Sequence, residues 1–249
     1  MTEHVIKQFN GFSGSSIYLM QDEHKKFIRK INNVERNYIK LIQLNELEYN
    51  VPKIYHKVDD ILDIEYIHGV DSQSFLKSYD FNILIEFIVT TINKFSNKQV
   101  LKDYTNIYTK KLDEINDYHL LPFTKEELLK KLPKIIPQSI CHGDFTLDNL
   151  IFSKNKFYMI DCSTGDFDSW VFDVAKLRQD LKFKWFLRNT NDKSLYNCLD
   201  LIDSTLIKLY PIAFNDNLLI LMLLRVFIYS KKDSYEQKFI IKKIESLWK

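Results

Sequence analysis

The segment that decides the fold is Cys141-His142-Gly143-Asp144-Phe145-Thr146-Leu147-Asp148-Asn149, and Asp161 follows it. Between Asn149 and Asp161 the aromatic and branched residues predict two short strands around a polar turn, a hairpin over 150–160. This hairpin brings Asp161 back beside Asn149. An amide and a carboxylate side by side, with a further Asp nearby, are oxygen ligands and a proton acceptor, which suit magnesium-nucleotide phosphoryl transfer.

The composition bounds the class of protein. The 249 residues are 45% hydrophobic, which is ample for a buried core. Lys and Arg total 35 against 33 Asp and Glu, so the near-neutral charge argues against a nucleic-acid partner. The three cysteines fit a reducing, cytoplasmic compartment, and the polar N-terminal residues do not resemble a signal peptide. The longest apolar run, 218–224, is too short to span a bilayer, so no membrane insertion is expected.

Strands and helices are unevenly distributed along the chain. Before Gly69 the patterns predict one helix, capped by Asn32-Asn33, and strands over 17–20, 26–31, 51–55 and 61–67. After Gly69 they predict helices over 81–95, after the capping box Thr124–Glu127, and over 173–187 and 217–230. A strand-rich part therefore precedes a larger helical part.

His142-Gly143-Asp144 through Asn149, then Ile160-Asp161 and Asp173-Val174-Ala175, resemble the aminoglycoside phosphotransferase and choline kinase superfamily. The resemblance implies an α+β, two-lobed, protein-kinase-like fold. Residues 1–68 would form a small antiparallel-sheet lobe with one helix that binds the nucleotide. Residues 69–249 would form a larger helical lobe with the catalytic loop and the acceptor site. ATP or GTP would be the co-substrate and Mg²⁺ the cofactor.

The resemblance also implies roles within the central motif. Asp144 would accept or orient the proton of the attacking hydroxyl, and His142 would orient the loop. Asn149 and Asp161 would hold the magnesium ion. Asp173 would brace the catalytic loop, although an ordinary helix N-cap is an equally good interpretation.

The nucleotide site is predicted from weaker motifs. A Gly-rich turn would bind phosphate through its backbone N–H groups and hydroxyls. The residues of this turn that would make the contacts are Gly11, Ser13, Gly14 and Ser15. Strand alternation places Lys30 and Arg29 on opposite faces, and Lys30 is preferred as the phosphate-binding cation with Arg29 as its rival.

Two further segments resemble parts of the nucleotide lobe. Glu35 would pair with the strand cation, or else would complete a capping box with Asn32. The backbone of a hinge over 65–69, with Glu65 and Ile67, would bind adenine.

Two departures from the protein-kinase pattern concern the substrate. Thr146 stands where a Ser/Thr protein kinase carries a lysine two residues after its catalytic Asp. Only eleven residues separate Asp161 from Asp173, too few for a long activation loop. Both departures favour a small hydroxylated acceptor over a protein.

Sequence features give conflicting indications of the acceptor. Asp166 and Asp168 would attract the amine of an amino sugar or choline, or would only cap the next helix. Trp170, Trp185 and Trp248 would suit an aromatic cage for choline, although tryptophans mostly pack in cores. A basic cluster comprises Lys176, Arg178, Lys182, Lys184 and Arg188. This cluster would instead bind an anionic sugar phosphate, or it would form a solvated helix face.

The string Asp173-Val174-Ala175-Lys176-Leu177 resembles bacterial phosphotransferases of surface-polysaccharide assembly. It favours a sugar or polyol hydroxyl as the acceptor. The alternatives are a choline, ethanolamine or aminoglycoside kinase, a catalytically inactive pseudokinase that acts as a binding module, and a carboxylate-metal hydrolase.

Overall fold

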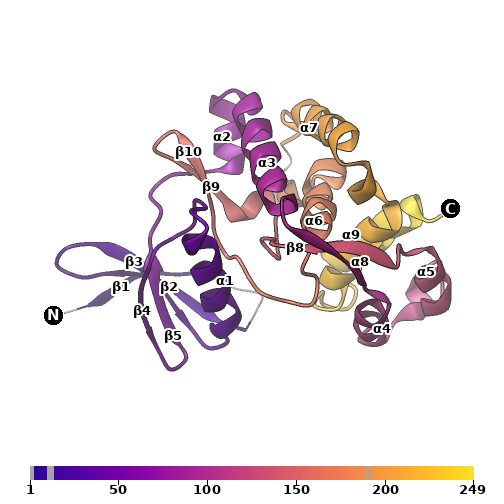
Figure 1. The fold of residues 1–249 in the computed structure, drawn as a ribbon, viewed down its shortest axis with the longest axis horizontal. Helices are drawn as coiled ribbons and strands as arrows, with labels where there is room; N and C mark the ends of the chain where they lie inside the picture. The colour runs from indigo at the N-terminus through magenta and orange to yellow at the C-terminus, as the bar shows by residue number, and fades with distance from the viewer. Residues whose placement is uncertain (1–2, 10–13, 189, 191) are drawn as a thin grey trace. The chain divides into compact units, whose positions relative to one another are not determined.

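The computed structural model describes residues 3–9, 14–188, 190 and 192–249 (Figure 1). The chain forms two compact units. The first comprises residues 1–80 and 148–165, and the second comprises 81–147 and 166–249. These units do not coincide with the lobes predicted over 1–68 and 69–249, and that lobe division stays a prediction.

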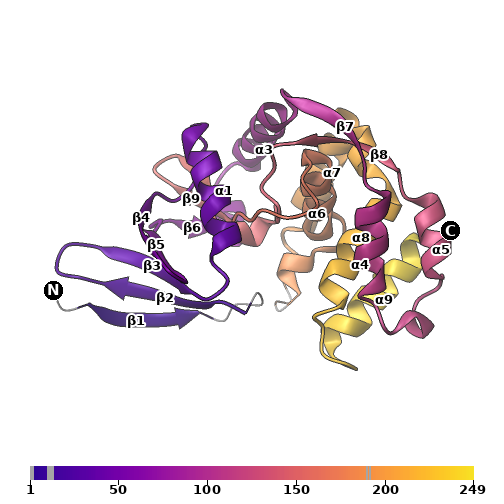
Figure 2. The same cartoon turned by 60° about the horizontal axis from the view of Figure 1, so that its bottom comes forward.

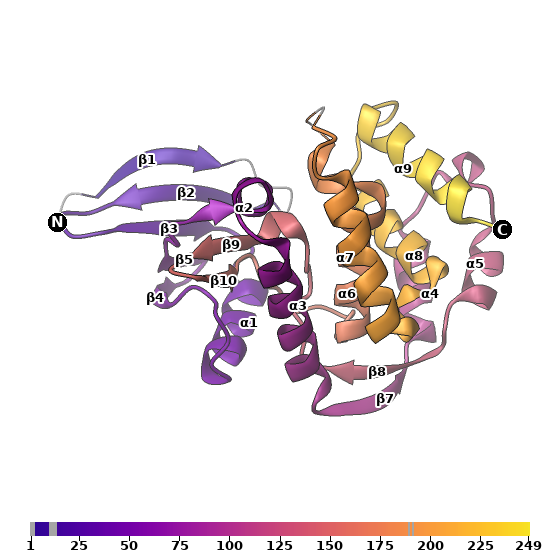
Figure 3. The ribbon, with the colours of Figure 1, turned by 90° about the horizontal axis from the view of Figure 1, so that it is seen from above.

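An antiparallel sheet is the main element of the first unit, and its strand order is β1-β2-β3-β5-β4. The strands are β1 (His4–Phe9), β2 (Ser16–Gln21), β3 (Lys26–Ile31), β4 (Ile54–Val58) and β5 (Ile61–Glu65). One helix, α1 (Glu35–Glu46), contacts β4 and buries Leu41 and Leu44 (Figure 3). A strand before the Gly-rich turn was expected without bounds, because the residues of β1 are almost all exposed and show no alternation of burial.

Two predicted boundaries in this unit are wrong. The fourth strand begins at Ile54 rather than at 51, beyond Pro52, which has no N–H for a strand ladder. Asn32 and Asn33 do not cap α1, because both have positive φ angles (69° and 55°) and form the turn before it. The N-cap residue is Val34, which makes no side-chain capping bond.

The predicted hairpin is present and belongs to a second sheet in the same unit. Strands β9 (Leu150–Ser153) and β10 (Lys156–Met159) are antiparallel, and β6 (Val70–Asp71) pairs with β9. The β6–β9 pairing explains why 148–165 groups with the N-terminal residues. A Cβ at Gly69 would lie 2.3 Å from the Phe152 carbonyl oxygen, so this close approach requires glycine. Helix α2 (Ser72–Ser78) follows β6 and buries Phe75 against Phe152 and Phe157.

Helices form most of the second unit. They are α3 (Phe81–Ser96), α4 (Thr105–Asp113), α5 (Lys125–Lys131), α6 (Trp170–Phe183), α7 (Tyr196–Leu209), α8 (Asp216–Phe227) and α9 (Tyr235–Leu247). Helix α6 is buried along nearly its whole length and contacts α3, α7 and α8. Thr124 and Glu127 form the predicted capping box of α5. A two-stranded ribbon of β7 (Gln99–Asp103) and β8 (Ile135–Ser139) leads into α4 (Figure 2).

The α+β class is therefore confirmed, with an antiparallel N-terminal sheet and a helical C-terminal part. Across the part of the chain that the structure describes, none of the helices has the length and apolar character needed to cross a bilayer.

Candidate active site

Side chains from α6 hold the loop that carries Asp144. The backbone N–H groups of His142 and Gly143 both donate to the Asp173 carboxylate, at 2.9 Å for Gly143. Ser169, rather than Asp173, caps α6, so the structure favours the bracing interpretation of Asp173 over the N-cap. Gly143 has a φ angle of 92°, a conformation that side-chain-bearing residues rarely adopt. The bend before Asp144 thus depends on a glycine and on one buried carboxylate.

Two more side chains fix this loop. Nδ1 of the fully buried His142 accepts the N–H of Asp144 at 3.2 Å. Oδ2 of Asp180, also on α6, accepts the N–H of Leu147 at 2.7 Å. These bonds leave His142 in an orienting position, and its role in catalysis stays a prediction.

The Asp144 side chain has a cationic partner that the sequence analysis missed. Nζ of Lys176 on α6 lies 3.2 Å from Oδ1 of Asp144, and the Asp144 side chain is 40% exposed. Burial raises the pKa of the Asp144 carboxyl, but the charges of Lys176 and Arg225 oppose burial, and that pKa lies below its usual range. The sequence held a signal for this contact, because Asp173, Lys176 and Asp180 recur at i, i+3 and i+7 on one helix face.

Hairpin β9–β10 brings the two predicted metal ligands together. The N–H of Ile160 donates to the Asn149 carbonyl at 2.9 Å, so Asp161 follows directly on the residue opposite Asn149. Nζ of Lys30 lies 2.6 Å from Oδ1 of Asp161, whose side chain is 53% exposed. An amide oxygen and an accessible carboxylate fit Mg²⁺, which usually takes one or two protein oxygens together with phosphate and water oxygens. Within the described ranges, no group of three or more His, Cys, Asp and Glu side chains is placed to hold a metal by itself.

The neighbouring strand residue Arg29 is engaged elsewhere. Its guanidinium binds both oxygens of Asp63, at 2.8 and 2.7 Å, and also Glu3. Lys30 is buried on the other face of β3 and contacts Asp161. The geometry therefore favours Lys30 over Arg29 as the cation near the predicted magnesium ligands.

Neither expectation for Glu35 matches the structure. Its carboxylate lies 3.4 Å from Nζ of Lys57 and is 65% exposed, whereas Lys30 pairs with Asp161. The capping box with Asn32 is also wrong, because α1 is capped at Val34 without a side-chain bond. Glu35 is the first residue of α1, where its negative charge suits the helix N-terminus.

The remaining predicted nucleotide residues lie around the first sheet. Gly11 and Ser13 fall outside the described residues. Gly14 precedes β2, and the Ser15 hydroxyl donates to the Asn32 carbonyl at 2.7 Å. Glu65 ends β5, where its N–H donates to the Lys53 carbonyl, and Ile67 lies in the link to β6. Their contacts with a nucleotide stay predictions.

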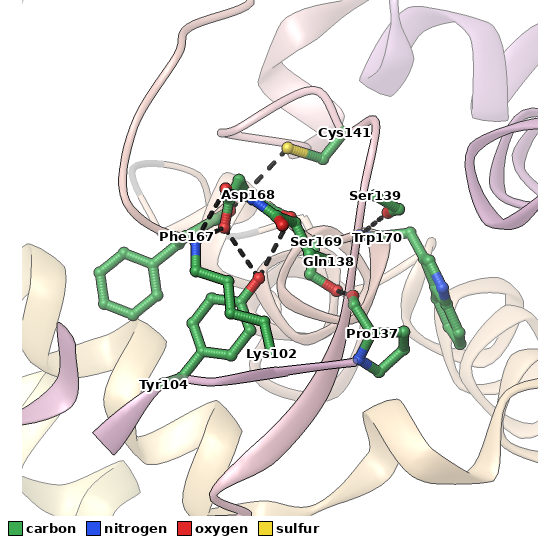
Figure 4. A network of polar contacts seen from close by, with 10 residues as sticks. All are labelled: Lys102, Tyr104, Pro137, Gln138, Ser139, Cys141, Phe167, Asp168, Ser169 and Trp170. Carbon is green, nitrogen blue, oxygen red and sulfur yellow. Dashed lines mark hydrogen bonds and ion pairs between the residues drawn. The ribbon is translucent and has the colours of Figure 1, made fainter. Parts of the chain in front are cut away.

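The carboxylate of Asp168 is already occupied by hydrogen bonds from neighbouring side chains (Figure 4). Nζ of Lys102 donates to its two oxygens at 2.9 and 3.0 Å, the Tyr104 hydroxyl donates at 2.8 Å, and Gln138 donates as well. These contacts tie the start of α6 to the ribbon β7–β8. The prediction that Asp168 faces the acceptor is therefore not supported. Asp166 is exposed and lies 3.9 Å from Lys110, a weak contact that leaves its predicted role open.

The predicted basic cluster and the predicted aromatic cage are both dispersed. Arg178 and Lys182 share Asp216, and Lys184 pairs with Asp200, so these cations balance acids of their own unit. Each tryptophan has a different aromatic partner: Trp170 packs on Tyr210, Trp185 on Phe239 and Trp248 on Phe123. Tryptophan packing therefore offers no cage for a quaternary ammonium group.

Comparison with known protein families gives a match in the middle of the chain. Residues 100–194 match the model of the phosphotransferase enzyme family. This range is less than half of the chain, but it contains the motif 141–149, Asp161 and the segment 173–177. This match confirms the prediction of a phosphotransferase-type enzyme. No curated protein matches the sequence.

Solved structures share the fold over nearly the whole chain. Aminoglycoside phosphotransferase APH(4)-Ia has a TM-score of 0.67 at 10% identity, over 99% of this chain and 93% of that one. Choline kinase LicA from Streptococcus pneumoniae has a TM-score of 0.64 at 17% identity, over 99% and 92%. The putative fructosamine-3-kinase of Haemophilus somnus has a TM-score of 0.58 at 17% identity, over 98% and 91%. The family match over residues 100–194 and the shared fold confirm the predicted resemblance to the aminoglycoside phosphotransferase and choline kinase superfamily.

Proposed function

We propose that the protein is a cytoplasmic, magnesium-dependent kinase that transfers the terminal phosphate of ATP or GTP to a hydroxyl of a sugar or related small alcohol. The observation that carries this proposal is the contact between Lys30 and Asp161. Sequence reasoning assigned one residue to the phosphates and the other to the metal, and they are 131 positions apart. Similar structures solved with ADP or AMP-PNP and hygromycin B support a nucleotide co-substrate.

The first unit would bind the nucleotide phosphates. Asn149 and Asp161 would hold Mg²⁺, which neutralises charge as the bond to the terminal phosphate breaks. The Lys30 ammonium, on a side chain that is 9% exposed and beside Asp161, would bind phosphate oxygens. The backbone of 14–16 and of the hinge 65–69 would position the rest of the nucleotide.

The second unit would supply the group that handles the acceptor proton. Asp144 has a depressed pKa, so its carboxylate is ionised at neutral pH and can accept a hydrogen bond from the attacking hydroxyl. The hydroxyl proton would pass to Asp144 as the oxygen bonds to phosphorus. Asp173, His142 and Asp180 would hold the loop so that this carboxylate needs no rearrangement during the reaction.

The resemblance of 173–177 to phosphotransferases of surface-polysaccharide assembly favours a sugar or polyol as the acceptor. Structural neighbours that act on aminoglycosides, choline and ethanolamine make these amino compounds the second candidates. The dispersed tryptophans and the engaged Asp168 carboxylate weigh against a cationic acceptor.

A panel assay tests the proposal. The protein is incubated with magnesium-ATP or magnesium-GTP and with sugars, polyols, amino sugars, choline and aminoglycosides, and nucleoside-diphosphate release and product mass are measured. We expect one class of hydroxyl compound to gain a single phosphate, and Asp144→Asn to lose this product. Full turnover by Asp144→Asn, or phosphate release from a monoester without nucleotide, would contradict the proposed mechanism.

A further inference from the structure

Arg225 is a charged side chain near the Asp144 loop to which the proposed mechanism assigns no role. It lies near the C-terminal end of α8 and is partly buried. Its Nη2 is 3.4 Å from the Gly143 carbonyl oxygen, its Nη1 is 3.3 Å from the Met222 sulfur, and its guanidinium is 4.9 Å from the centre of the Phe167 ring. The ring contact and the carbonyl hold the guanidinium beside the residue that precedes Asp144.

Arg225 has no carboxylate partner among the residues that the structure describes. Arg178, by contrast, is buried between Asp203 and Asp216. A guanidinium carries five N–H donors in a fixed fork, and two weak contacts with a carbonyl and a sulfur leave most of them available. Such a group is suited to bidentate binding of phosphate or carboxylate.

Arg225 is a second cation, besides Lys176, close to Asp144. Lys176 already balances Asp144, at 3.2 Å. Asp173 and Asp180 are buried and their carboxylates accept backbone N–H groups of the loop. Arg225 lowers the pKa of Asp144 together with Lys176, so its charge is felt at the catalytic carboxylate. Arg225 therefore carries a positive charge close to Asp144 without an ion pair of its own in the described ranges, and its remaining N–H donors suit an anionic group of a ligand.

We propose that Arg225 determines acceptor specificity by binding an anionic group, phosphate or carboxylate, on the hydroxyl compound that Asp144 activates. This inference rests on the proposed function and narrows its acceptor to anionic sugars or polyols. The same chemistry would also suit the transferred phosphate of the nucleotide, so the experiment must separate these two sources.

Binding is measured first, without nucleotide, by calorimetric titration of inorganic phosphate and of glucuronate into the intact protein. The variants are Arg225→Gln, which removes the charge, and Arg225→Lys, which keeps it without the fork. Lys182→Met is the matched control, because it removes a cation that pairs with Asp216 away from the loop. Thermal unfolding of each variant checks that the fold is retained.

We expect Arg225→Gln to weaken phosphate and glucuronate binding by about 10- to 100-fold, Arg225→Lys to weaken it less, and Lys182→Met to leave it unchanged. Turnover is then compared for glycerol 3-phosphate against glycerol, and for glucuronate against glucose and glucosamine. Wild-type enzyme should prefer the anionic member of each set, and Arg225→Gln should lose that preference through KM rather than kcat.

Three results would overturn the inference: equal anion binding by Arg225→Gln and wild type, a preference for glucosamine or choline, or a loss of ATP but not ADP affinity in Arg225→Gln with the acceptor preference unchanged. The last result would assign Arg225 to the transferred phosphate. Arg225-dependent anion binding without transfer to any acceptor would contradict the proposed function alone.

Discussion

In each compact unit a lysine pairs with an aspartate of the predicted site, and these two pairs differ in their surroundings. In the first unit Lys30, on a strand, reaches Asp161 after a hairpin, at 2.6 Å. In the second unit Lys176, on a helix, reaches Asp144 in a loop, at 3.2 Å. In both pairs the lysine is about one tenth exposed and the carboxylate is about half exposed.

The difference lies in what else contacts the aspartate's segment. Asp161 follows a hairpin strand and has a positive φ angle of 56°, and its carboxylate is the more exposed of the two. The loop of Asp144 is held by Asp173, His142 and Asp180, with Arg225 as a second cation. The first pair is therefore suited to open toward a metal ion and phosphates, whereas the second is suited to keep one carboxylate ionised and fixed. Four predictions test this contrast.

The largest effect is expected at Asp144. Asp144→Asn removes the proton acceptor while it preserves shape, so kcat should fall by roughly 10²- to 10⁴-fold. Nucleotide binding, which the proposal assigns to the first unit, should stay largely intact. Single-turnover kinetics and nucleotide titration measure the two effects. A parallel loss of nucleotide affinity in Asp144→Asn would contradict the assignment of nucleotide binding to the first unit and of proton transfer to the second.

The next effect is expected at Asp161. Asp161→Asn should lower kcat by about 10²- to 10³-fold, because it removes a charged metal ligand, and it should weaken the magnesium dependence of nucleotide binding. Asp148→Asn is the control, since it neutralises an exposed carboxylate beside Asn149. Magnesium titration in the presence of nucleotide measures the change, and an unaltered magnesium dependence would exclude Asp161 as a ligand.

Lys30 and Arg29 should respond in opposite ways. Lys30→Met should lower kcat/KM for the nucleotide by about 10²-fold through loss of a charge-assisted phosphate contact. Arg29→Met should leave kinetics nearly unchanged but reduce the free energy of unfolding by about 1–3 kcal/mol, because Asp63 stays buried without its partner. Denaturant unfolding and steady-state kinetics separate the two. If Arg29→Met lowered kcat/KM for the nucleotide and Lys30→Met did not, Arg29 would be the cation that binds phosphate.

The smallest effect concerns the pH dependence set by Lys176. Burial raises the pKa of Asp144 and Lys176 opposes it, so Lys176→Met should raise that pKa. Asp144 acts when ionised, and activity falls as the pH drops through its pKa. The acidic limb of the kcat profile should therefore move to higher pH. An unmoved limb would mean that Lys176 does not control Asp144.

Much of the fold was predictable because it depends on local patterns. The hairpin that returns Asp161 to Asn149 was evident from aromatic and branched residues around a polar turn, and the Thr124–Glu127 capping box from two residues at fixed spacing. Strand β1 received no predicted bounds because its exposed residues give no alternation, and α6 was expected to begin three residues too late because Ser169 caps it instead of Asp173.

The sequence by itself determined the chemical types in the site: a catalytic-loop aspartate, an amide and a carboxylate at hairpin spacing, and a strand with two rival cations. Motif residues are close in sequence, so their spacing alone constrains their geometry. Only the tertiary structure decided which ion pairs form: Lys30 pairs with Asp161, Glu35 with Lys57, and Lys176 with Asp144. It also decided that Asp168 accepts hydrogen bonds from Lys102 and Tyr104. Each of these pairings joins residues of separate elements. The sequence offers several oppositely charged partners for each charged side chain, and packing determines which partner lies within contact distance.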